Sequence, residues 1–428
     1  MSLPPETKPF KPGEERFSPQ PVGYLLGRVG LIILLVGLFF AAWYGQVVIV
    51  ILLGLVLAAA GLAKLWSRFS LAGVSCQRFL SERRVFPGEQ VELRLRVANR
   101  KPLPLPWLQV DDEIPARFAL NTSLVPGNRP GTRFLSKSAA LLWYTGVSWR
   151  HSLYCNKRGY YTLGPVMVTS GDIFGFYPRS ATQPLIDHII VYPRIFSIAQ
   201  LGMPSLYPLG GTKAEQHIFE DPTRPVGVRD YSPRDSFKRI HWKASARHQN
   251  LQSKVYEPTT TLKVALFLAV DSFQHGGVFK EDDFELGIST AASIANYVTE
   301  QGSPVGLYVN TRLADSGQPL IISPSSGTGQ LVNILEALAK VTSLTSSPFE
   351  EFLLNERKAL PWGTTFIFIL SRPSESLMAI LANLKENGNK LLVLQVGEPG
   401  ESKIEHTVTW HKVRQPGDFM KISSKEAI

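Results

Sequence analysis

The sequence predicts a multidomain protein in which an N-terminal two-helix transmembrane hairpin is followed by an all-β sandwich and a doubly wound α/β domain. Three observations predict this fold class: a long uncharged apolar stretch near the start, short runs of alternating apolar residues in the middle, and alternating strands and helices in the last third. At 428 residues, the chain also exceeds one ordinary domain of ~100–200 residues. The expected segments are 1–21 as a disordered leader, 22–69 as two transmembrane helices, 72–200 as the β-sandwich, 201–260 as a signature linker segment and 261–428 as the α/β domain.

The transmembrane hairpin rests on the 35 residues between Arg28 and Lys64, none of which is charged. As one helix they would extend ~52 Å, whereas a single membrane crossing needs only ~20 residues. Aromatic residues and a glycine at 43–46 favour a turn at the membrane interface, which divides the stretch into Tyr24–Tyr44 and Val47–Leu65. A cleaved signal peptide is the alternative, but its apolar region of ~7–15 residues is much shorter than this run.

Charge predicts the side of the membrane on which the rest of the chain lies. Basic residues flank the hairpin on both sides and are missing from its turn. They are Lys8, Lys11, Arg16 and Arg28 before the hairpin, and Lys64, Arg68, Arg78, Arg83 and Arg84 after it. The positive-inside rule then predicts a plasma-membrane protein with its soluble domains on the cytoplasmic side. There the sequon at 121–123 would stay unmodified, and Cys76 and Cys155 would stay reduced.

The formal net charge of +10 is concentrated in two places. Residues 1–69 carry a net charge of +3 and residues 224–257 a net charge of +5, so the rest of the chain is nearly neutral. The first region reflects the membrane topology. Because the second region mixes Asp with Arg and contains no recognisable nucleic-acid-binding module, we expect no nucleic acid partner.

The middle of the chain has the pattern of short strands. In Val91–Val97 the apolar residues alternate with polar ones, as in a strand with one buried face. Gly, Pro and Asn residues interrupt the pattern at short intervals, which is typical of a β-sandwich. Five aromatic residues could form a binding stripe, but at alternating positions we expect them to pack in the core or at sheet edges. They are Trp107, Trp143, Trp149, Tyr160 and Tyr161.

The last third of the chain predicts an open parallel sheet covered by helices. Residues 262–270 are an apolar run typical of a buried parallel strand, and 284–301 predict a helix with a broad apolar face. Further strands at 304–309, 364–370 and 390–396 alternate with helices at 329–341 and 375–387. Ligands of such sheets bind at the carboxyl ends of the strands, which makes Asp271 and Ser272 candidate site residues. Since no phosphate loop, nucleophile elbow or paired-histidine zinc motif accompanies them, we expect no catalytic residue.

The most unusual stretch of the chain is 224–247, which joins the two predicted domains. Ser232-Pro233 predicts a turn, and Asp235 or Ser236 can cap a short helix. On that helix, cations spaced four apart would share one face and apolar residues another. The two faces are Arg239, Lys243 and Arg247, and Phe237, Ile240 and Ala244. Cations backed by apolar residues predict an anionic partner.

Four short motifs lie in this stretch: Arg229-Asp230-Tyr231, Pro233-Arg234-Asp235, Arg239-Ile240-His241-Trp242 and Ser245-Ala246-Arg247. Together they resemble the signature of domain-of-unknown-function family fifty-eight (DUF58), which runs Arg-Glu-Tyr, a Pro-Gly-Asp turn, Arg-x-Ile-His-Trp and Ser-Ala-Arg. Here Asp230 replaces the usual Glu, and Arg234 replaces the Gly of the turn. Upstream, Asp172-Ile173-Phe174-Gly175 is also similar to the β-domain of this family.

The resemblance implies a fold, a partner and a set of site residues. DUF58 members typically have two N-terminal membrane helices, an immunoglobulin-like β-domain and a von Willebrand factor A-like α/β domain, and they are commonly associated with MoxR-type AAA+ ATPases. It therefore implies a membrane-anchored cytoplasmic adaptor or scaffold that works with such an ATPase in the maturation or assembly of protein complexes. The implied interaction residues are Arg229, Asp230, Tyr231, Asp235, Arg239, His241, Trp242 and Arg247.

The metal site of von Willebrand factor A-like domains is an Asp-x-Ser-x-Ser loop after the first strand, and this chain departs from it. The corresponding loop is Asp271-Ser272-Phe273-Gln274-His275, so Phe273 and His275 replace two serine ligands. Mg²⁺ needs several oxygen ligands, of which only Asp271 remains. We therefore expect a degenerate site, with no metal and no other cofactor.

Three alternatives stay open for the signature. Arg229, Asp230 and Asp235 could pair with one another and with the β-domain, and so lock two domains in one orientation. The basic residues could bind anionic lipid, since each Lys or Arg near the inner leaflet gains ~1 kcal/mol. A hydrolase could use Asp235, His241 and Asp271 as acid and base, although no nucleophile or oxyanion-stabilising group accompanies them.

Overall fold

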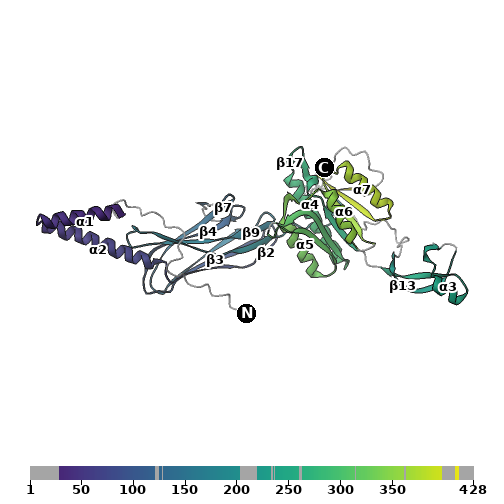
Figure 1. Cartoon of the computed structure of the whole chain (residues 1–428), viewed down its shortest axis with the longest axis horizontal. Helices are drawn as coiled ribbons and strands as arrows, with labels where there is room; N and C mark the ends of the chain where they lie inside the picture. The colour runs from purple at the N-terminus through teal and green to yellow at the C-terminus, as the bar shows by residue number, and fades with distance from the viewer. Residues whose placement is uncertain are drawn as a thin grey trace, which may run out of the picture. The chain divides into compact units, whose positions relative to one another are not determined.

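The structure is a computed structural model that describes residues 28–120, 125–127, 129–202, 219–232, 235, 237–259, 263–313, 315–360, 363–397 and 410–413. These residues form two compact units, one that ends at Val191 and one that begins at Tyr192. In chain order, Figure 1 shows two apolar helices, a β-rich region, a hairpin with a short helix and an α/β region. The predicted leader, the start of the first predicted span and the sequon lie outside the described residues.

Two apolar helices, α1 (Arg28–Trp43) and α2 (Val47–Ser70), pack against each other. The turn between them lies where the sequence predicts it and contains Gly45, whose φ of 65° favours glycine. Helix α2 continues beyond the predicted end at Leu65, so it includes Arg68 as well as Lys64. Among the described residues, α2 is long and apolar enough to cross a membrane, whereas α1 is shorter.

Three sheets make up the β-rich region and bury one apolar core. Every second residue of β3 is buried, as its alternating sequence predicts. The first sheet contains, in order, β1 (Val74–Leu80), β3 (Gln90–Asn99), β8 (Gly146–Tyr154) and β5 (Ala119–Leu120). The second contains β11 (Arg179–Gln183), β10 (Val166–Ser170), β4 (Leu105–Pro115), β7 (Thr132–Leu141) and β6 (Val125–Pro126). The third contains β2 (Arg84–Val85), β12 (Asp187–Val191) and β9 (Gly159–Leu163).

Apolar side chains of the first two sheets fill the common core. Leu93 and Leu153 of the first sheet are fully buried with Leu108 and Ile114 of the second. Each such side chain contributes about 1.5–3 kcal/mol to folding. Of the five aromatic residues expected in the core or at sheet edges, four are buried or half-buried. The prediction is wrong for Trp143, which is 58% exposed.

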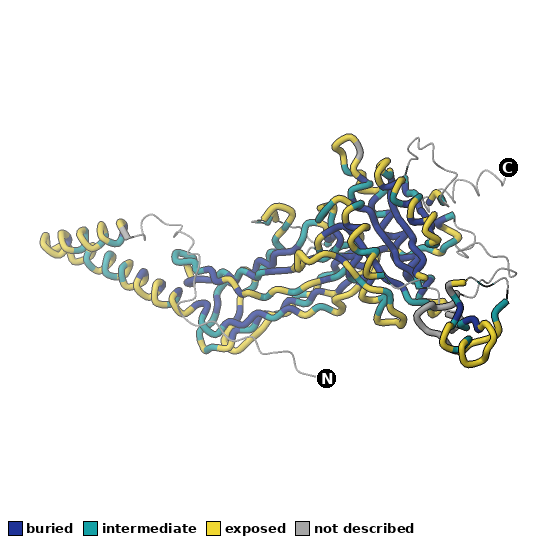
Figure 2. Tube along the Cα trace, turned by 45° about the vertical axis from the view of Figure 1, so that its right-hand side comes forward, coloured by how far each residue is buried: buried dark blue, intermediate teal, exposed yellow. Residues whose placement is uncertain are grey.

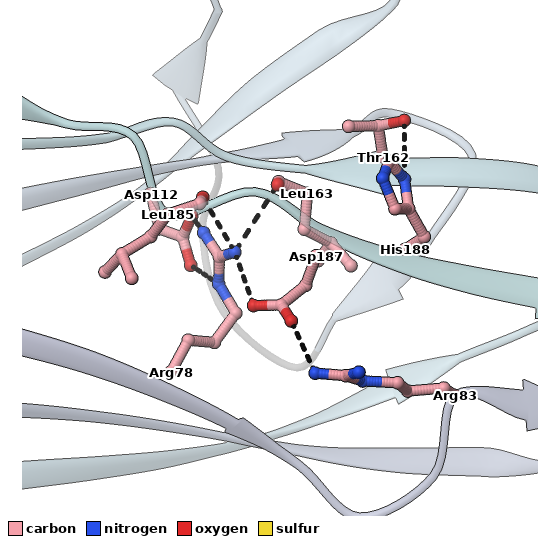
Figure 3. A network of polar contacts seen from close by, with 8 residues as sticks. All are labelled: Arg78, Arg83, Asp112, Thr162, Leu163, Leu185, Asp187 and His188. Atoms are coloured by element: carbon pink, nitrogen blue, oxygen red, sulfur yellow. Dashed lines mark hydrogen bonds and ion pairs between the residues drawn. The ribbon is translucent and has the colours of Figure 1, made fainter. Parts of the chain in front are cut away.

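A buried ion-pair network joins strands of all three sheets (Figure 3). Arg78 on β1 pairs with Asp112 on β4, with Nε 3.0 Å from Oδ2, and both side chains are fully buried. The Nη1 atom of Arg78 also donates to the carbonyl oxygen of Leu185 at 3.1 Å and lies 3.2 Å from Oδ2 of Asp187 on β12. An unpaired charge in the core lowers the free energy of unfolding, so these groups stabilise the folded state only when all of them are present.

The α/β region contains one sheet with strand order β19 (Pro319–Ser325), β18 (Val305–Leu313), β15 (Val264–Leu268), β21 (Thr365–Leu370), β22 (Leu391–Val396) and β23 (Trp410–Val413), while β20 (Val341–Thr345) pairs with β18. Strands β18, β15, β21, β22 and β23 are parallel, whereas β19 and β20 pair antiparallel with β18. The helices are α4 (Glu281–Glu300), α5 (Thr328–Lys340), α6 (Phe349–Glu356) and α7 (Glu375–Glu386). The predicted strands and helices are confirmed, whereas β19, β20, β23 and α6 were not predicted.

Helices cover both faces of this sheet, whose strands are deeply buried (Figure 2). Ala265 and Phe267 of β15 pack in one core with α6 and α7, while Leu268 lies close to Gly287 of α4 on the other face. Strands β18 and β21 flank β15 on opposite sides, so the strand order reverses there. The carboxyl end of β15 is therefore the position at which open α/β sheets bind ligands. A small pair of strands, β16 (Gln274–His275) and β17 (Val278–Phe279), follows.

Candidate functional site

The four motifs of the predicted linker fold into one hairpin, which we call the signature hairpin (219–259; Figure 1). Its strands, β13 (Phe219–Asp230) and β14 (Gln252–Thr259), pair antiparallel, with Asp230 opposite Gln252. The connection between them contains a 3₁₀ turn (Phe237–Arg239) and helix α3 (Trp242–His248). The backbone N–H of His241 donates to the carbonyl oxygen of Gln252 at 2.8 Å, which fastens the connection to β14.

Asp235 closes the turn that follows β13. Its Oδ1 accepts a hydrogen bond from Nη2 of Arg229 at 2.6 Å, and its Oδ2 accepts one from the backbone N–H of Ser232 at 3.0 Å. The N–H of Ser232, and then Arg229, hold the pKa of this carboxyl below its ordinary value. The side chain is 8% exposed, whereas that of Arg229 is 50% exposed. The expectation that Asp235 caps a helix is therefore wrong, because its oxygens are taken up within the turn.

Helix α3 is capped by His241 and not by Asp235, while Ser236, the other predicted cap, lies outside the described residues. The Nδ1 atom of His241 accepts a hydrogen bond from the backbone N–H of Ala244 at 3.1 Å, so that nitrogen carries no proton in this arrangement. With φ −93° and ψ 84°, His241 interrupts the helical conformation, and this separates the 3₁₀ turn from α3. The prediction of one continuous helix with a row of three cations is wrong, since of these only Lys243 and Arg247 lie on α3.

A chain of hydrogen bonds connects α3 to both strands. The Oγ of Ser245 donates to the carbonyl oxygen of His241 at 3.1 Å and accepts from the N–H of Gln252 at 2.8 Å. The Nε2 of Gln252 donates to Oδ1 of Asp230 at 2.6 Å. Ile240 and Ser253 are buried beneath them. His241, Ser245, Gln252 and Asp230 therefore hold the shape of the hairpin.

The outer surface of the signature hairpin combines aromatic and basic side chains. Trp242 is 69% exposed and Phe237 is 75% exposed, and none of the residues of α3 is buried. Lys243 and Arg247 are exposed beside them, whereas Arg239 and Tyr231 are half-buried. The predicted apolar face is wrong for Phe237, while Ile240 is buried as expected. Exposed aromatic residues among cations have the composition of a protein-binding surface.

The predicted site at the end of β15 forms a separate polar cluster. Oδ2 of Asp271 accepts from the backbone N–H of Phe349 at 2.8 Å, and burial raises the pKa of this carboxyl. Ser272 Oγ donates to the carbonyl oxygen of Ala269 at 2.6 Å and accepts from the N–H of Ser371 at 3.0 Å. These bonds join the ends of β15 and β21 to the start of α6.

The described residues around Asp271 do not fit a Mg²⁺ site. Phe273 stands at the position of a serine ligand, and its fully buried ring packs against Phe284, 5.5 Å away between centroids. In the part of the chain that the structure describes, no group of three or more His, Cys, Asp or Glu side chains could hold a metal ion. The side chain of His275 lies outside the described residues. Mg²⁺ requires near-octahedral oxygen coordination, which Asp271 and an engaged Ser272 do not supply.

One curated relative is the "Uncharacterized protein YeaD" of Bacillus subtilis (strain 168). It is 26% identical over 247 residues, which cover 57% of this chain, and the chain spans 58% of the length of that relative. Solved structures with a detectable likeness include a CARDB domain from Pyrococcus furiosus (13% identity, TM-score 0.19, 28% of this chain and 91% of that one). Another is a cohesin module from Clostridium perfringens (15% identity, TM-score 0.20, 28% of this chain and 96% of that one). At these TM-scores, neither likeness says what this chain binds.

The family model described as "Protein of unknown function DUF58" matches residues 227–351. This range begins at Gly227 in β13 and ends in α6, so it includes all the interaction residues implied by the resemblance, as well as Asp271 and Ser272. A DUF58 domain is thus found at residues 227–351, built from the end of β13, the rest of the signature hairpin and the first half of the α/β region.

Proposed function

We propose that the chain is a membrane-anchored cytoplasmic adaptor or scaffold and that its signature hairpin binds a MoxR-type AAA+ ATPase. The observation that carries this proposal is the construction of the hairpin: an internal hydrogen-bonded network fixes its shape, while Trp242, Phe237, Lys243 and Arg247 remain exposed. Rigid aromatic anchors with basic neighbours are typical of binding hot spots. The class of partner comes from the resemblance to DUF58.

The proposal includes a finer architecture. Both α1 and α2 would cross the plasma membrane, with basic residues keeping the soluble parts in the cytoplasm. The β-rich region would be an immunoglobulin-like sandwich, since its sheets bury one common core. The α/β region would be von Willebrand factor A-like with a degenerate metal site, which the strand reversal at β15 and the buried Phe273 support.

Affinity capture of the tagged full-length chain from membranes tests the adaptor function. The native chain should recover an AAA+ ATPase, recognised by mass spectrometry and by ATP hydrolysis in the eluate. Trp242→Ala should reduce recovery at least about tenfold, because an anchor at the centre of an interface contributes about 1.4 kcal/mol or more. Leu344→Ala is the matched control, since Leu344 is 74% exposed on β20, outside the hairpin. Equal recovery with both variants, or no ATPase with the native chain, would contradict the proposal.

Binding of anionic lipid is the second candidate, favoured by the exposed Lys243 and Arg247 on α3. Lys243→Glu would then weaken binding of the chain to anionic vesicles at low salt, and physiological salt would weaken vesicle binding by the native chain to a similar extent.

The geometry of the signature hairpin does not favour a hydrolase. The carboxylate of Asp235 accepts hydrogen bonds from the side chain of Arg229 and the backbone N–H of Ser232, and the imidazole of His241 caps α3.

A further inference from the structure

Two loops at one end of the β-rich region carry exposed large apolar side chains. The turn between β7 and β8 presents Leu142, Trp143 and Tyr144, which are 59%, 58% and 68% exposed. The loop between β10 and β11 presents Ile173 and Phe174, which are 57% and 62% exposed. Turns usually contain Gly, Asn, Asp or Ser, so consecutive large apolar residues there are unusual. Exposed apolar residues that cluster in this way mark a contact surface.

Both loops are built to hold these side chains outward. Tyr144 has a φ of 54°, a conformation that is uncommon for residues other than glycine. The turn is fixed because Asn99 Nδ2 donates to the carbonyl oxygen of Leu142 at 2.9 Å. In the second loop, the buried carboxylate of Asp172 accepts from the N–H of Phe174 at 3.0 Å. The apolar tips are therefore preorganised, which lowers the entropic cost of binding.

The same two loops are connected to the C-terminal end of α2, one of them through Lys101 in the loop between β3 and β4. Nζ of Lys101 donates to the carbonyl oxygen of Phe69 at 2.7 Å and also bonds that of Ser70, while the N–H of Tyr144 donates to the carbonyl oxygen of Lys101 at 3.4 Å. On the other side, Ser67 Oγ donates to the carbonyl oxygen of Tyr177 at 2.5 Å. The end of α2 is thus joined to the β7–β8 turn through Lys101 and to the β10–β11 loop directly.

The helical rise places these contacts at the level of lipid headgroups. The uncharged part of α2 ends at Lys64, and Ser67 and Ser70 lie about 4.5 and 9 Å further along the helix. The headgroup layer on each side of a bilayer is ~5–8 Å thick, so Ser67 lies within it and Ser70 lies at its outer boundary. Trp and Tyr side chains favour this layer, and the exposed Arg68 and Arg100 complement anionic headgroups there.

We propose that this end of the β-rich region lies in the headgroup layer of the bilayer that α2 crosses, with Trp143, Tyr144 and Phe174 inserted between lipids. The inference rests on the membrane anchoring in the proposed function and adds a second contact with the same membrane. Together with the bonds from Lys101 and Ser67, this contact holds the β-rich region against the membrane surface and fixes its tilt.

Depth measurements on the full-length chain in lipid vesicles test this contact. Single cysteines carrying an environment-sensitive fluorophore are introduced as Trp143→Cys and Phe174→Cys, while the native Cys76 and Cys155 are buried and stay unlabelled. Ile186→Cys is the matched control, because Ile186 is 55% exposed in the loop between β11 and β12, at the opposite end of the sheets. Leu52→Cys, within α2, serves as the reference for membrane insertion.

Nitroxide-labelled lipids should quench probes at positions 143 and 174 several-fold more strongly than the probe at 186. The proposed loop contact is wrong if the probe at 52 is quenched but those at 143 and 174 are quenched as weakly as the probe at 186. The membrane anchoring would still hold in that case. The exposed apolar loops would then bind a protein partner instead of lipid. If the probe at 52 is not quenched either, the anchoring fails, and this inference fails with it.

Discussion

Asp271 is a carboxylate whose ionisation opposes folding of the α/β region. Burial raises its pKa above the ordinary value of 3.8, and the nearby Glu350 acts in the same direction. The folded state therefore binds the proton more tightly than the unfolded state does. The contribution of Asp271 to stability is most favourable below pH 3.8 and falls as the pH rises through the raised folded value.

Asp271→Asn should consequently raise the melting temperature of the α/β region at pH 7. The amide oxygen can still accept the N–H of Phe349 but carries no charge. We expect a rise of no more than about 2–4 °C, the equivalent of about 1 kcal/mol, because the carboxylate is partly exposed and solvent screens it. Calorimetry of the native chain and the variant from pH 4 to pH 8 measures the difference, which should shrink toward acid pH.

The same variant tests the prediction of a degenerate metal site. If Asp271 were a ligand, Asp271→Asn would lower the melting temperature in Mg²⁺, and Mg²⁺ would stabilise the native chain by mass action. We expect added Mg²⁺ to leave both melting temperatures unchanged. A Mg²⁺-dependent rise in the native chain alone would overturn the expectation of no metal.

Helix α3 depends on its cap, because a helix of 7 residues with no buried side chain gains little from packing. His241→Ala removes the side-chain acceptor for the N–H of Ala244, which also donates to the carbonyl oxygen of His241 at 3.0 Å, and should cost about 1 kcal/mol. Hydrogen exchange at Ala244 and Ser245 should then be about fivefold faster, since 1.4 kcal/mol corresponds to a factor of ten.

His241→Asn is the control, because its side-chain oxygen can accept the same hydrogen bond. If His241 acts by positioning Trp242, Asn at this position should restore both the slow exchange and the capture of the ATPase. Slow exchange without capture would instead show that the imidazole itself contacts the partner.

Elements with a strong local pattern could be predicted from the sequence, and those that depend on distant pairing could not. The alternation in β3 and the apolar face of α4 lie within single segments, so both were found. The edge strand β19 and the 8-residue α6 have weak patterns. The motifs of the signature hairpin identified the candidate residues, but the cap by His241 depends on strand β14, which pairs with it across the hairpin. Likewise, the exposure of Trp143 follows from its place at a sheet end.

Each unit of the chain has its own apolar core, one in the β-rich region and one in the α/β region. The β-rich region also has a buried network of Arg78, Asp112 and Asp187 among that core. Burial raises the pKa of Asp112, since Arg78 offsets only part of the desolvation of its carboxylate. The three sheets therefore depend on complete pairing at this point.

Arg78→Met should lower the free energy of unfolding of the β-rich unit by about 3–5 kcal/mol, because it leaves Asp112 buried without its partner. The double variant Arg78→Met/Asp112→Leu should recover part of this loss, since no charge then remains buried in place of the pair. Arg83→Met is the matched control: Nη2 of Arg83 lies 2.9 Å from Oδ1 of Asp187, but the side chain is 72% exposed, so its loss should cost less than about 1 kcal/mol.

Thermal unfolding of the full chain measures these effects. Arg78→Met should lower the midpoint temperature of the β-rich unit and leave that of the α/β unit unchanged. A double variant less stable than Arg78→Met would mean that Asp112 is stabilising on its own, and a shift of both transitions would mean that the two units unfold together.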